Sequence, residues 1–244
     1  MGSFIDRMKT HPRMLRMMRF SYRLSIRFRN AFLTVVYLPI VTRKTIIDPS
    51  AEVSSSAVIA RKGVRIGRNC RIMPGVVILE RAEIGDGSSI GPNTVVSSEG
   101  FDCFNYGTGV IAKKHAGAVR IGEGVQIGAC CCIDKGNNRR STTAIGDHSS
   151  VGDAVHIAHN VMTGERCTIS SGVTFAGHVL LGDEVNVGMN ATISNRISIA
   201  AGSVVMRGAV VSRNLDAKGT VEGNFAVDSG RFRSFMRSIV NGAG

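Results

Sequence analysis

Three histidines lie within a short stretch of this chain, at a spacing that suits acid–base chemistry. Two stand in His156-Ile157-Ala158-His159-Asn160, and the pair Gly177-His178 follows further along. Histidine is a suitable general base because its ordinary pKa lies near neutrality, and a glycine N–H can hold the oxyanion of a tetrahedral intermediate. Acyl transfer needs both groups, since a base must remove the proton of the attacking amine or hydroxyl.

The sequence around these residues repeats with a period of six. Large apolar residues recur at every sixth position from residue 145 to residue 205, with the polar Thr163 as the exception. This period fits neither a helix nor an alternating strand. It is typical of a parallel β-helix, a prism in which each hexapeptide contributes one short strand and one turn. The apolar positions are Ile145, Val151, Ile157, Ile169, Phe175, Leu181, Val187, Ile193, Ile199 and Val205.

This repeat places two of the chemically interesting residues next to each other. Ile157 and Phe175 are core positions separated by three hexapeptides, which make one coil of a three-sided prism. His159 and Gly177 therefore occupy the same turn position on successive coils, about one strand spacing of ~4.8 Å apart. A single turn histidine is ordinarily just a polar surface residue. The stacked register favours a catalytic pair.

The six-residue phase defines the expected domain organisation. We predict a β-helix domain over residues 45–210, a basic amphipathic segment over 1–44, and an extension over 211–244 that ends in a short helix. The phase is interrupted at 97–118 and at 136–143. Insertions in a solenoid tend to fall on the binding face, so both loops are predicted to wall the site.

Charge is concentrated at the two ends of the chain, which has a net charge of +12. The part between the ends is neutral and lacks nucleic-acid-binding motifs, so we expect no nucleic acid partner. Residues 1–44 suit either an anionic membrane surface or packing along the solenoid. The apolar run 31–41 is too short to span a bilayer. Without a signal-peptide pattern, a cytoplasmic location is expected, with peripheral contact to the inner membrane as one interpretation of the basic segment.

Three stretches of the sequence resemble the UDP-3-O-acylglucosamine N-acyltransferases of lipid A synthesis over about residues 45–210. They are Ile121-Gly122-Glu123-Gly124-Val125-Gln126-Ile127-Gly128-Ala129, Ile133-Asp134-Lys135-Gly136 and His156-Ile157-Ala158-His159-Asn160-Val161. Ser98-Glu99-Gly100-Phe101 and Lys113-Lys114 also look like that family's loop. The motif around His159 is specific, whereas the plain hexapeptides are less so.

The resemblance implies a left-handed β-helix homotrimer with active sites between subunits. It makes His159 the catalytic base and the Gly177 amide the oxyanion donor, with no bound cofactor or metal. The acyl donor would be acyl carrier protein or coenzyme A, and the acceptor an amino sugar on a nucleotide or a lipid carrier. The residues assigned to substrate binding are His156, Asn160, His178, Phe101, Lys113 and Lys114.

Departures from the family pattern leave the substrate open. The family's uridine-binding N-terminal domain is replaced by the basic segment 1–44. The sister family of UDP-N-acetylglucosamine O-acyltransferases has Asp after the base, where this chain has Asn160. An acetyl-coenzyme A-dependent sugar N- or O-acetyltransferase and a non-catalytic β-helix scaffold are the alternatives. A hexapeptide carbonic anhydrase is disfavoured, because its zinc-binding histidine pair has a wider spacing than His156 and His159.

Overall fold

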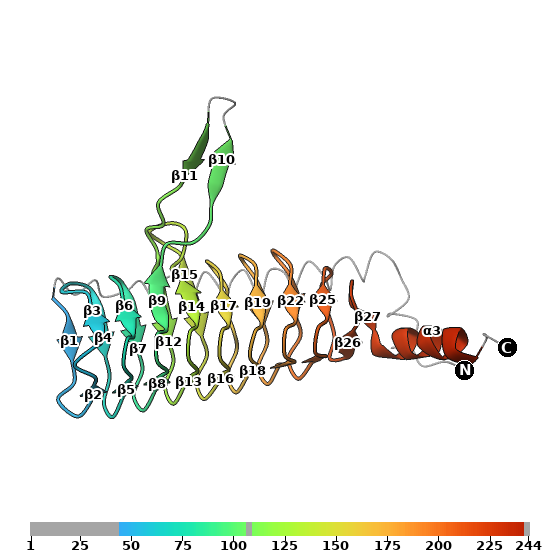
Figure 1. Ribbon diagram of the computed structural model, residues 1–244, viewed down its shortest axis with the longest axis horizontal. Coiled ribbons are helices and arrows are strands. Elements are labelled where there is room, and N and C mark those ends of the chain that lie inside the picture. The colour runs from blue at the N-terminus through green and yellow to red at the C-terminus, as the bar shows by residue number, and fades with distance from the viewer. Residues whose placement is uncertain (1–43, 106–108, 242–244) are drawn as a thin grey trace, which may run out of the picture. The chain divides into compact units, whose positions relative to one another are not determined.

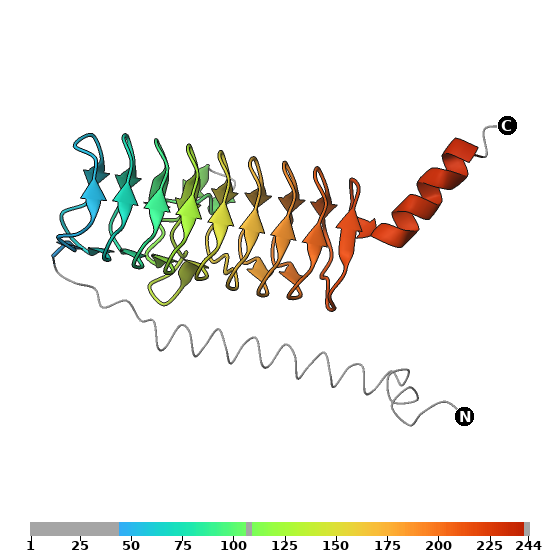
Figure 2. The same ribbon diagram turned by 90° about the horizontal axis from the view of Figure 1, so that it is seen from below.

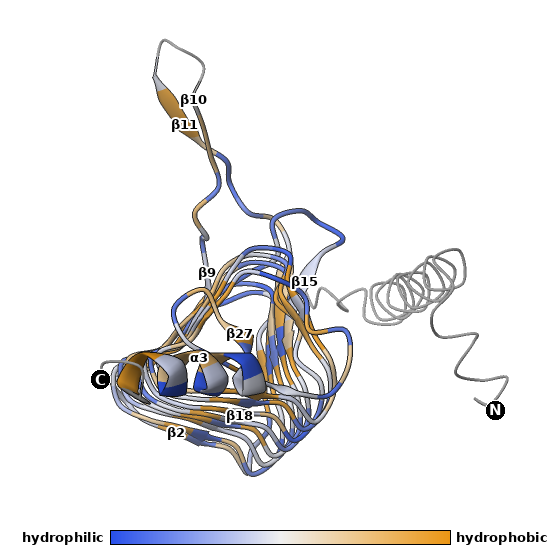
Figure 3. Cartoon of the chain, turned by 90° about the vertical axis from the view of Figure 1, so that its right-hand side faces the viewer, coloured by the Kyte–Doolittle hydropathy of each residue, from blue (hydrophilic) through white to orange (hydrophobic). Residues whose placement is uncertain are grey.

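The computed structural model describes residues 44–105 and 109–241 of the chain. Within them, short parallel strands stack coil on coil into a three-sided solenoid (Figures 1 and 3). This confirms the predicted left-handed β-helix. The basic segment predicted over 1–44 lies, except for Lys44, outside the described residues.

Each face of the prism is one ladder of parallel strands (Figure 2). The first face contains β1 (Ile46–Ile47), β4 (Val64–Ile66), β7 (Ala82–Ile84), β12 (Ala118–Ile121) and β15 (Thr142–Ile145). Parallel bridges through Met162 continue it to the later pair β20 (Leu180–Leu181) and β23 (Ser198–Ile199).

The second face is the longest ladder. It consists of β2 (Glu52–Val53), β5 (Arg71–Ile72), β8 (Ser89–Ile90), β13 (Gln126–Ile127), β16 (Ser150–Val151), β18 (Thr168–Ile169), β21 (Asn186–Val187), β24 (Val204–Val205) and β26 (Thr220–Glu222), with β27 (Val227–Asp228) added antiparallel at its end.

The third face carries the histidine motif. It consists of β3 (Val58–Ile59), β6 (Val77–Ile78), β9 (Val95–Ser98), β14 (Cys132–Asp134), β17 (His156–Ile157), β19 (Thr174–Phe175), β22 (Thr192–Ile193) and β25 (Val210–Val211). Because β14, β17 and β19 are neighbours, residues at the ends of these three strands come together.

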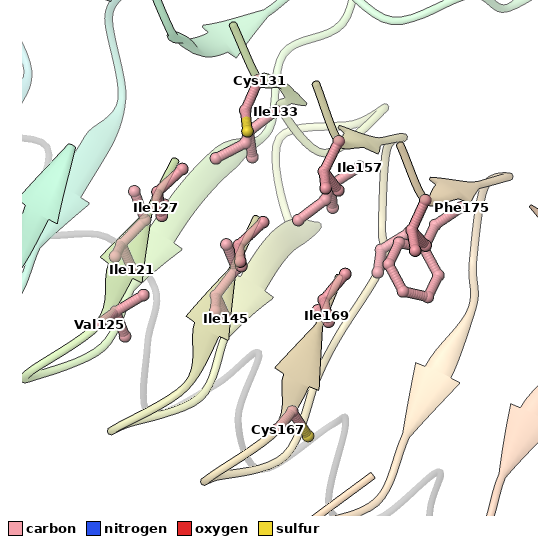
Figure 4. Packing of buried hydrophobic residues seen from close by; sticks show 14 of the residues in the cluster. Ile121, Val125, Ile127, Cys131, Ile133, Ile145, Ile157, Cys167, Ile169 and Phe175 are labelled. Carbon is pink, nitrogen blue, oxygen red and sulfur yellow. The ribbon is translucent and has the colours of Figure 1, made fainter. Parts of the chain in front are cut away.

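The recurring apolar residues fill the interior of the prism. Ile133 in β14, Ile157 in β17 and Phe175 in β19 are fully buried and point into the prism (Figure 4). Their packing holds the backbone of the third face in place. Thr163 occupies a core position although it is polar. Its hydroxyl accepts the Gly146 N–H at 3.0 Å and donates to the Gly164 carbonyl at 3.2 Å, so the buried polar group is satisfied.

The dependence of stability on this core can be tested with one chemical change at two sites. Ile169→Val removes a methylene group from a core position that is 1% exposed. We expect a loss of about 0.5–1.5 kcal/mol in the free energy of unfolding, because the cavity cannot close fully. The same change at Ile111, which is 59% exposed on a hairpin, should leave stability unchanged. Equal shifts of the urea midpoint for the two variants would contradict this description of the core.

Five of the turns between faces share a backbone cap. In these turns the N–H two residues after the core position donates to a side-chain oxygen of the next coil, which saturates a group that no strand partner reaches. The donor and acceptor pairs are Arg68 with Asp86 at 2.8 Å, Glu123 with Asp147 at 2.9 Å, Ala129 with Asp153 at 2.7 Å, Asp153 with Ser171 at 3.0 Å, and Glu165 with Asp183 at 3.0 Å.

At both predicted interruptions of the repeat, the chain leaves the solenoid after a strand of the third face. The first contains an antiparallel hairpin, β10 (Cys103–Asn105) and β11 (Val110–Ala112), which projects away from the coils (Figure 1). The second, at 136–143, is a compact turn between β14 and β15. His159 and Gly177 also follow strands of this face, so they share its corner with both insertions.

The predicted short helix of the C-terminal extension is α3 (Ser229–Asn241). The Phe232 ring packs over Gly223, where a Cβ atom would lie 2.9 Å from it. Arg233 pairs with Glu222 at 3.2 Å, and the two contacts hold the start of the helix on β26 and β27. In the described residues, no helix combines the length and the apolar character needed to cross a membrane.

Candidate functional site

The imidazole of His159 lies directly on Gly177, as the register predicts. A Cβ atom at residue 177 would be 2.6 Å from His159 Cε1 and 2.8 Å from Nε2, closer than real side chains approach. Gly177 is therefore buried beneath the ring, and only glycine leaves room for it. The pairing Ile157↔Phe175 in β17 and β19 sets this stack.

The N–H of Gly177 differs from the capped N–H groups of the equivalent turns. Gly177 stands two residues after the core residue Phe175, the position whose N–H donates to an oxygen of the next coil in five other turns. At Gly177 no acceptor is within hydrogen-bond range among the described residues. Because carboxylate oxygens bind several of the equivalent N–H groups, this turn geometry suits an anionic oxygen.

Hydrogen bonds fix the tautomer of His159. The Asn160 Oδ1 atom accepts the backbone N–H of Asn137 at 2.9 Å, which identifies it as the amide oxygen. It lies 3.3 Å from His159 Nδ1, so Nδ1 must be the protonated nitrogen that donates to it. The free lone pair is then on Nε2, the nitrogen beside Gly177. Asn160 thus orients the imidazole as a base.

Two further imidazoles pack against His159. His115 and His178 have ring centroids 5.1 Å and 5.2 Å from that of His159, both nearly perpendicular to it. His178 occupies a left-handed turn position at φ 62°, and its N–H donates to the His159 carbonyl at 3.0 Å. The structure therefore gathers three histidines around the Gly177 turn.

The surroundings keep His159 neutral. Burial lowers its pKa, the hydrogen bond to Asn160 opposes this, and the neighbouring His115 adds to the lowering. Burial and the charge of His159 likewise lower the pKa of His178. A neutral imidazole is the form that can accept a proton.

These shifts predict how activity depends on pH. His159 can act as a base only when neutral, so activity should be lost as pH falls through its lowered pKa. We expect the acid limb of kcat/KM, measured between about pH 5 and 8, to have its midpoint below the ordinary histidine value of 6.5. A midpoint above that value would contradict His159 as the base.

A second pair of titratable groups lies on the same face. His156 Nε2 is 3.1 Å from Oδ2 of the nearly fully buried Asp134, whose Oδ1 accepts the Ser98 hydroxyl at 2.6 Å. The hydrogen bond to Asp134 raises the pKa of His156, although burial opposes it. The pair therefore favours a positively charged His156 beside a neutral His159.

Cys132 joins this pair in a cluster that could hold a metal ion. Its Sγ, an Asp134 oxygen and a His156 nitrogen lie within 4.8 Å of one another, and zinc binds all three atom types. Burial raises the pKa of Cys132, which disfavours the thiolate that a metal needs. Since Asp134 and His156 already satisfy each other, we interpret the cluster as an ion pair.

The remaining predicted residues lie at the base of the hairpin. Phe101 is 86% exposed, Lys114 is also exposed, and Lys113 pairs with Asp102 at 3.4 Å. Lys113 is close enough for its charge to lower the pKa of His178. Of these three residues, only Lys113 is shown to act electrostatically on the histidine cluster.

Two residues of the site were not assigned roles from the sequence, His115 and Asp134. Asp134 follows the core residue Ile133, which pairs with Ile157 across a coil lengthened by the 136–143 insertion. Counting core positions rather than residues would have placed it beside His156. His115 comes from the end of the first insertion, which has no repeat to count.

The sequence comparisons support the resemblance. Residues 63–98 match the family of bacterial transferase hexapeptide repeats. UDP-3-O-acylglucosamine N-acyltransferase of Caulobacter sp. (strain K31) is 34% identical over 58% of this chain and 41% of its own length. The enzyme of that name from Herminiimonas arsenicoxydans is 30% identical over 65% of this chain and 46% of its own length. The chain thus spans less than half of these curated relatives.

Solved structures support the fold. UDP-N-acetylglucosamine acyltransferase from Bacteroides fragilis is similar with a TM-score of 0.60 and 21% identity, covering 80% of this chain and 81% of that one. The Arabidopsis UDP-N-acetylglucosamine acyltransferase has a TM-score of 0.58 and 22% identity, with 79% and 77% covered. At this identity the likeness establishes the β-helix alone.

Proposed function

We propose that the chain is an acyltransferase of lipid A-type synthesis that moves an acyl group from a thioester to an amino sugar. The observation that carries this proposal is the free Nε2 of His159 against the uncapped N–H of Gly177. The names of the curated relatives, which specify acylglucosamine N-acyltransferases, support the same reaction class.

In the proposed reaction, the acceptor amine or hydroxyl attacks the thioester carbonyl carbon while His159 Nε2 takes its proton. The carbonyl oxygen becomes an oxyanion that the Gly177 N–H stabilises. When the intermediate collapses, the C–S bond breaks and the imidazolium returns its proton to the leaving thiolate. The products are the acylated sugar and a free thiol, and His159 is neutral again.

The proposed donor is the phosphopantetheine thioester of acyl carrier protein or coenzyme A. Both are anionic, and acyl carrier protein is an acidic partner. Exposed basic residues stand on both insertions at the site corner, which suits such a donor. They are Lys113, Lys114, Arg139 and Arg140. Phe101, exposed in the same loop, is proposed to contact the substrate.

The proposed acceptor is a sugar nucleotide or a lipid-linked amino sugar. Pairing with Asp134 raises the pKa of His156 and so favours its positively charged form, which is suited to the phosphate groups of either acceptor. Asn160 and His178 complete the proposed binding surface around His159.

We further propose a cytoplasmic homotrimer with the site at the subunit boundary. The basic segment 1–44 is proposed to rest on the inner membrane. Deleting these residues should abolish sedimentation with anionic phospholipid vesicles, and unchanged sedimentation would remove the membrane proposal.

Mass spectrometry of the reaction products tests the function. Acyl carrier protein thioesters of several lengths and acetyl-coenzyme A would each be combined with UDP-3-O-acylglucosamine, UDP-N-acetylglucosamine and GDP-linked amino sugars. An acyl mass gain on one acceptor supports the proposal, and fragmentation distinguishes an amide from an ester. Transfer from acetyl-coenzyme A alone would indicate a sugar acetyltransferase. No transfer from any donor would favour a non-catalytic scaffold.

A further inference from the structure

His115 has a polar atom that no described residue satisfies. The residue is 4% exposed and lies between the hairpin and β12. Its Nε2 atom is fully buried and has no hydrogen-bond partner in the described part of the chain. Burying a polar group without a hydrogen-bond partner destabilises a fold, so an unpaired atom in a native fold calls for an explanation.

The main chain around His115 is held firmly. Its backbone N–H donates to Glu99 Oε2 at 2.7 Å, and the other Glu99 oxygen pairs with Lys135 at 2.8 Å. Lys135 follows Asp134 on the neighbouring strand β14. The insertion is thus tied to the third face on both sides of the hairpin, and His115 is placed by rigid elements.

The ring of His115 is equally constrained. The Gly100 N–H donates to His115 Nδ1 at 3.2 Å, and a Cβ atom at Gly100 would lie 2.6 Å from His115 Cε1. Because Nδ1 accepts a hydrogen bond, Nε2 of the neutral ring carries the proton. His115 therefore presents one oriented N–H donor, with its ring packed against the base His159 at 5.1 Å.

The position of the His115 N–H relative to His159 indicates which substrate it binds. Gly177, the proposed oxyanion donor, belongs to the coil after His159. His115 packs with Gly100, which follows β9, and Gly100 lies near Asp134 of the coil before His159. The acyl carbonyl oxygen is assigned to the Gly177 N–H, and the acceptor gives its proton to His159 Nε2. The rest of the acceptor must then lie among the groups around His159, of which His115 is one.

Resting on the proposed function, we infer that His115 Nε2–H donates a hydrogen bond to an oxygen of the acyl acceptor, either a sugar hydroxyl or a phosphate oxygen. His115 is then an acceptor-binding residue within the acyltransferase site. Binding of the acceptor satisfies the buried donor. An acceptor that lacks the matching oxygen leaves the donor unpaired and is discriminated against.

Two substitutions separate this role from a structural one. In His115→Gln the side-chain NH₂ can reach the position of Nε2 and donate, whereas in His115→Asn the amide reaches only the position of Nδ1. With UDP-3-O-acylglucosamine as the probe, we expect His115→Asn to raise the acceptor KM about tenfold or more, the loss of one buried hydrogen bond of about 1.4 kcal/mol. His115→Gln should stay within about threefold of wild type, and the donor KM should not change in either variant.

The other outcomes overturn the inference. An unchanged acceptor KM in His115→Asn, with wild-type turnover intact, refutes it while leaving the acyltransferase proposal standing. A shift in the acid limb of the pH profile without a change in KM would show that His115 acts only through His159. Loss of the assembled state, measured by light scattering, in both variants would assign the ring to packing. No turnover by the wild-type protein refutes the proposed function itself, and this inference with it.

Discussion

His159→Ala is expected to lower kcat by about 10²–10⁴-fold, the usual contribution of a positioned general base. Nε2 of His159 carries the free lone pair beside Gly177. The two neighbouring imidazoles, those of His115 and His178, are each held in place by other contacts. His178 is held by its left-handed backbone and His115 by Gly100. Neither can move into the vacated place without breaking these contacts. The measurement is steady-state kinetics with saturating donor and acceptor.

The chain offers a matched control for this change. His148 is an exposed turn histidine whose Nδ1 lies 2.6 Å from the Cβ position of Gly124, so it also stacks an imidazole on a glycine. It lies away from the third-face corner, and His148→Ala should leave kcat unchanged. If both variants, or neither, lose activity, His159 is not the base.

Gly177→Ala is expected to lower kcat by about 10²–10³-fold, the cost of losing one oxyanion donor. The added Cβ would lie 2.6 Å from His159 Cε1, so the imidazole must move off the turn. The change displaces the base and covers the donor N–H with one methyl group. The same kinetic assay measures it, with thermal unfolding recorded alongside.

Gly219→Ala is the control for the backbone effect. A Cβ at residue 219 meets only ordinary contacts, 3.7 Å from Leu215 Cδ1 and 3.8 Å from the Ala217 carbonyl. We expect this variant to keep full activity. Full activity in Gly177→Ala as well would show that the turn under His159 takes no part in the reaction.

The solenoid and its central stack could be predicted from the sequence because a strict period fixes register. From Ile145 onward, counting in steps of six assigns each core residue to its coil and its face. The pairing of Ile157 with Phe175, and with it the position of His159 over Gly177, therefore follows from the sequence alone. The left-handed coil came from family resemblance, since a period of six does not determine hand.

The two insertions explain why counting residues missed His115 and Asp134. His115 reaches the cluster through a hairpin whose path depends on tertiary contacts with Glu99 and Gly100. Asp134 reaches His156 across a coil of irregular length. His115 arrives through a non-repeating segment and has no register to reveal it, so only the folded structure could show its contacts. Counting core positions instead of residues would have placed Asp134 beside His156.

The turns of the solenoid suggest how a repetitive fold acquires a site. In several other turns the equivalent N–H is capped by a carboxylate or hydroxyl of the next coil, as with Glu165 and Asp183. At Gly177 no cap is present among the described residues, and the imidazole of His159 lies above the same turn. The proposed site thus combines an uncapped turn N–H with an imidazole stacked on the same turn.

A double-mutant cycle on His159 and Gly177 tests the central claim most directly. Single-turnover rates of acyl transfer would be measured for the wild type, His159→Ala, Gly177→Ala and the double variant. Groups that act in one step are strongly non-additive, so we predict that the double variant is no slower than the slower single variant by more than about threefold. Losses that multiply in full would show that the two residues act independently, and would contradict the account of His159 and Gly177 as one catalytic unit.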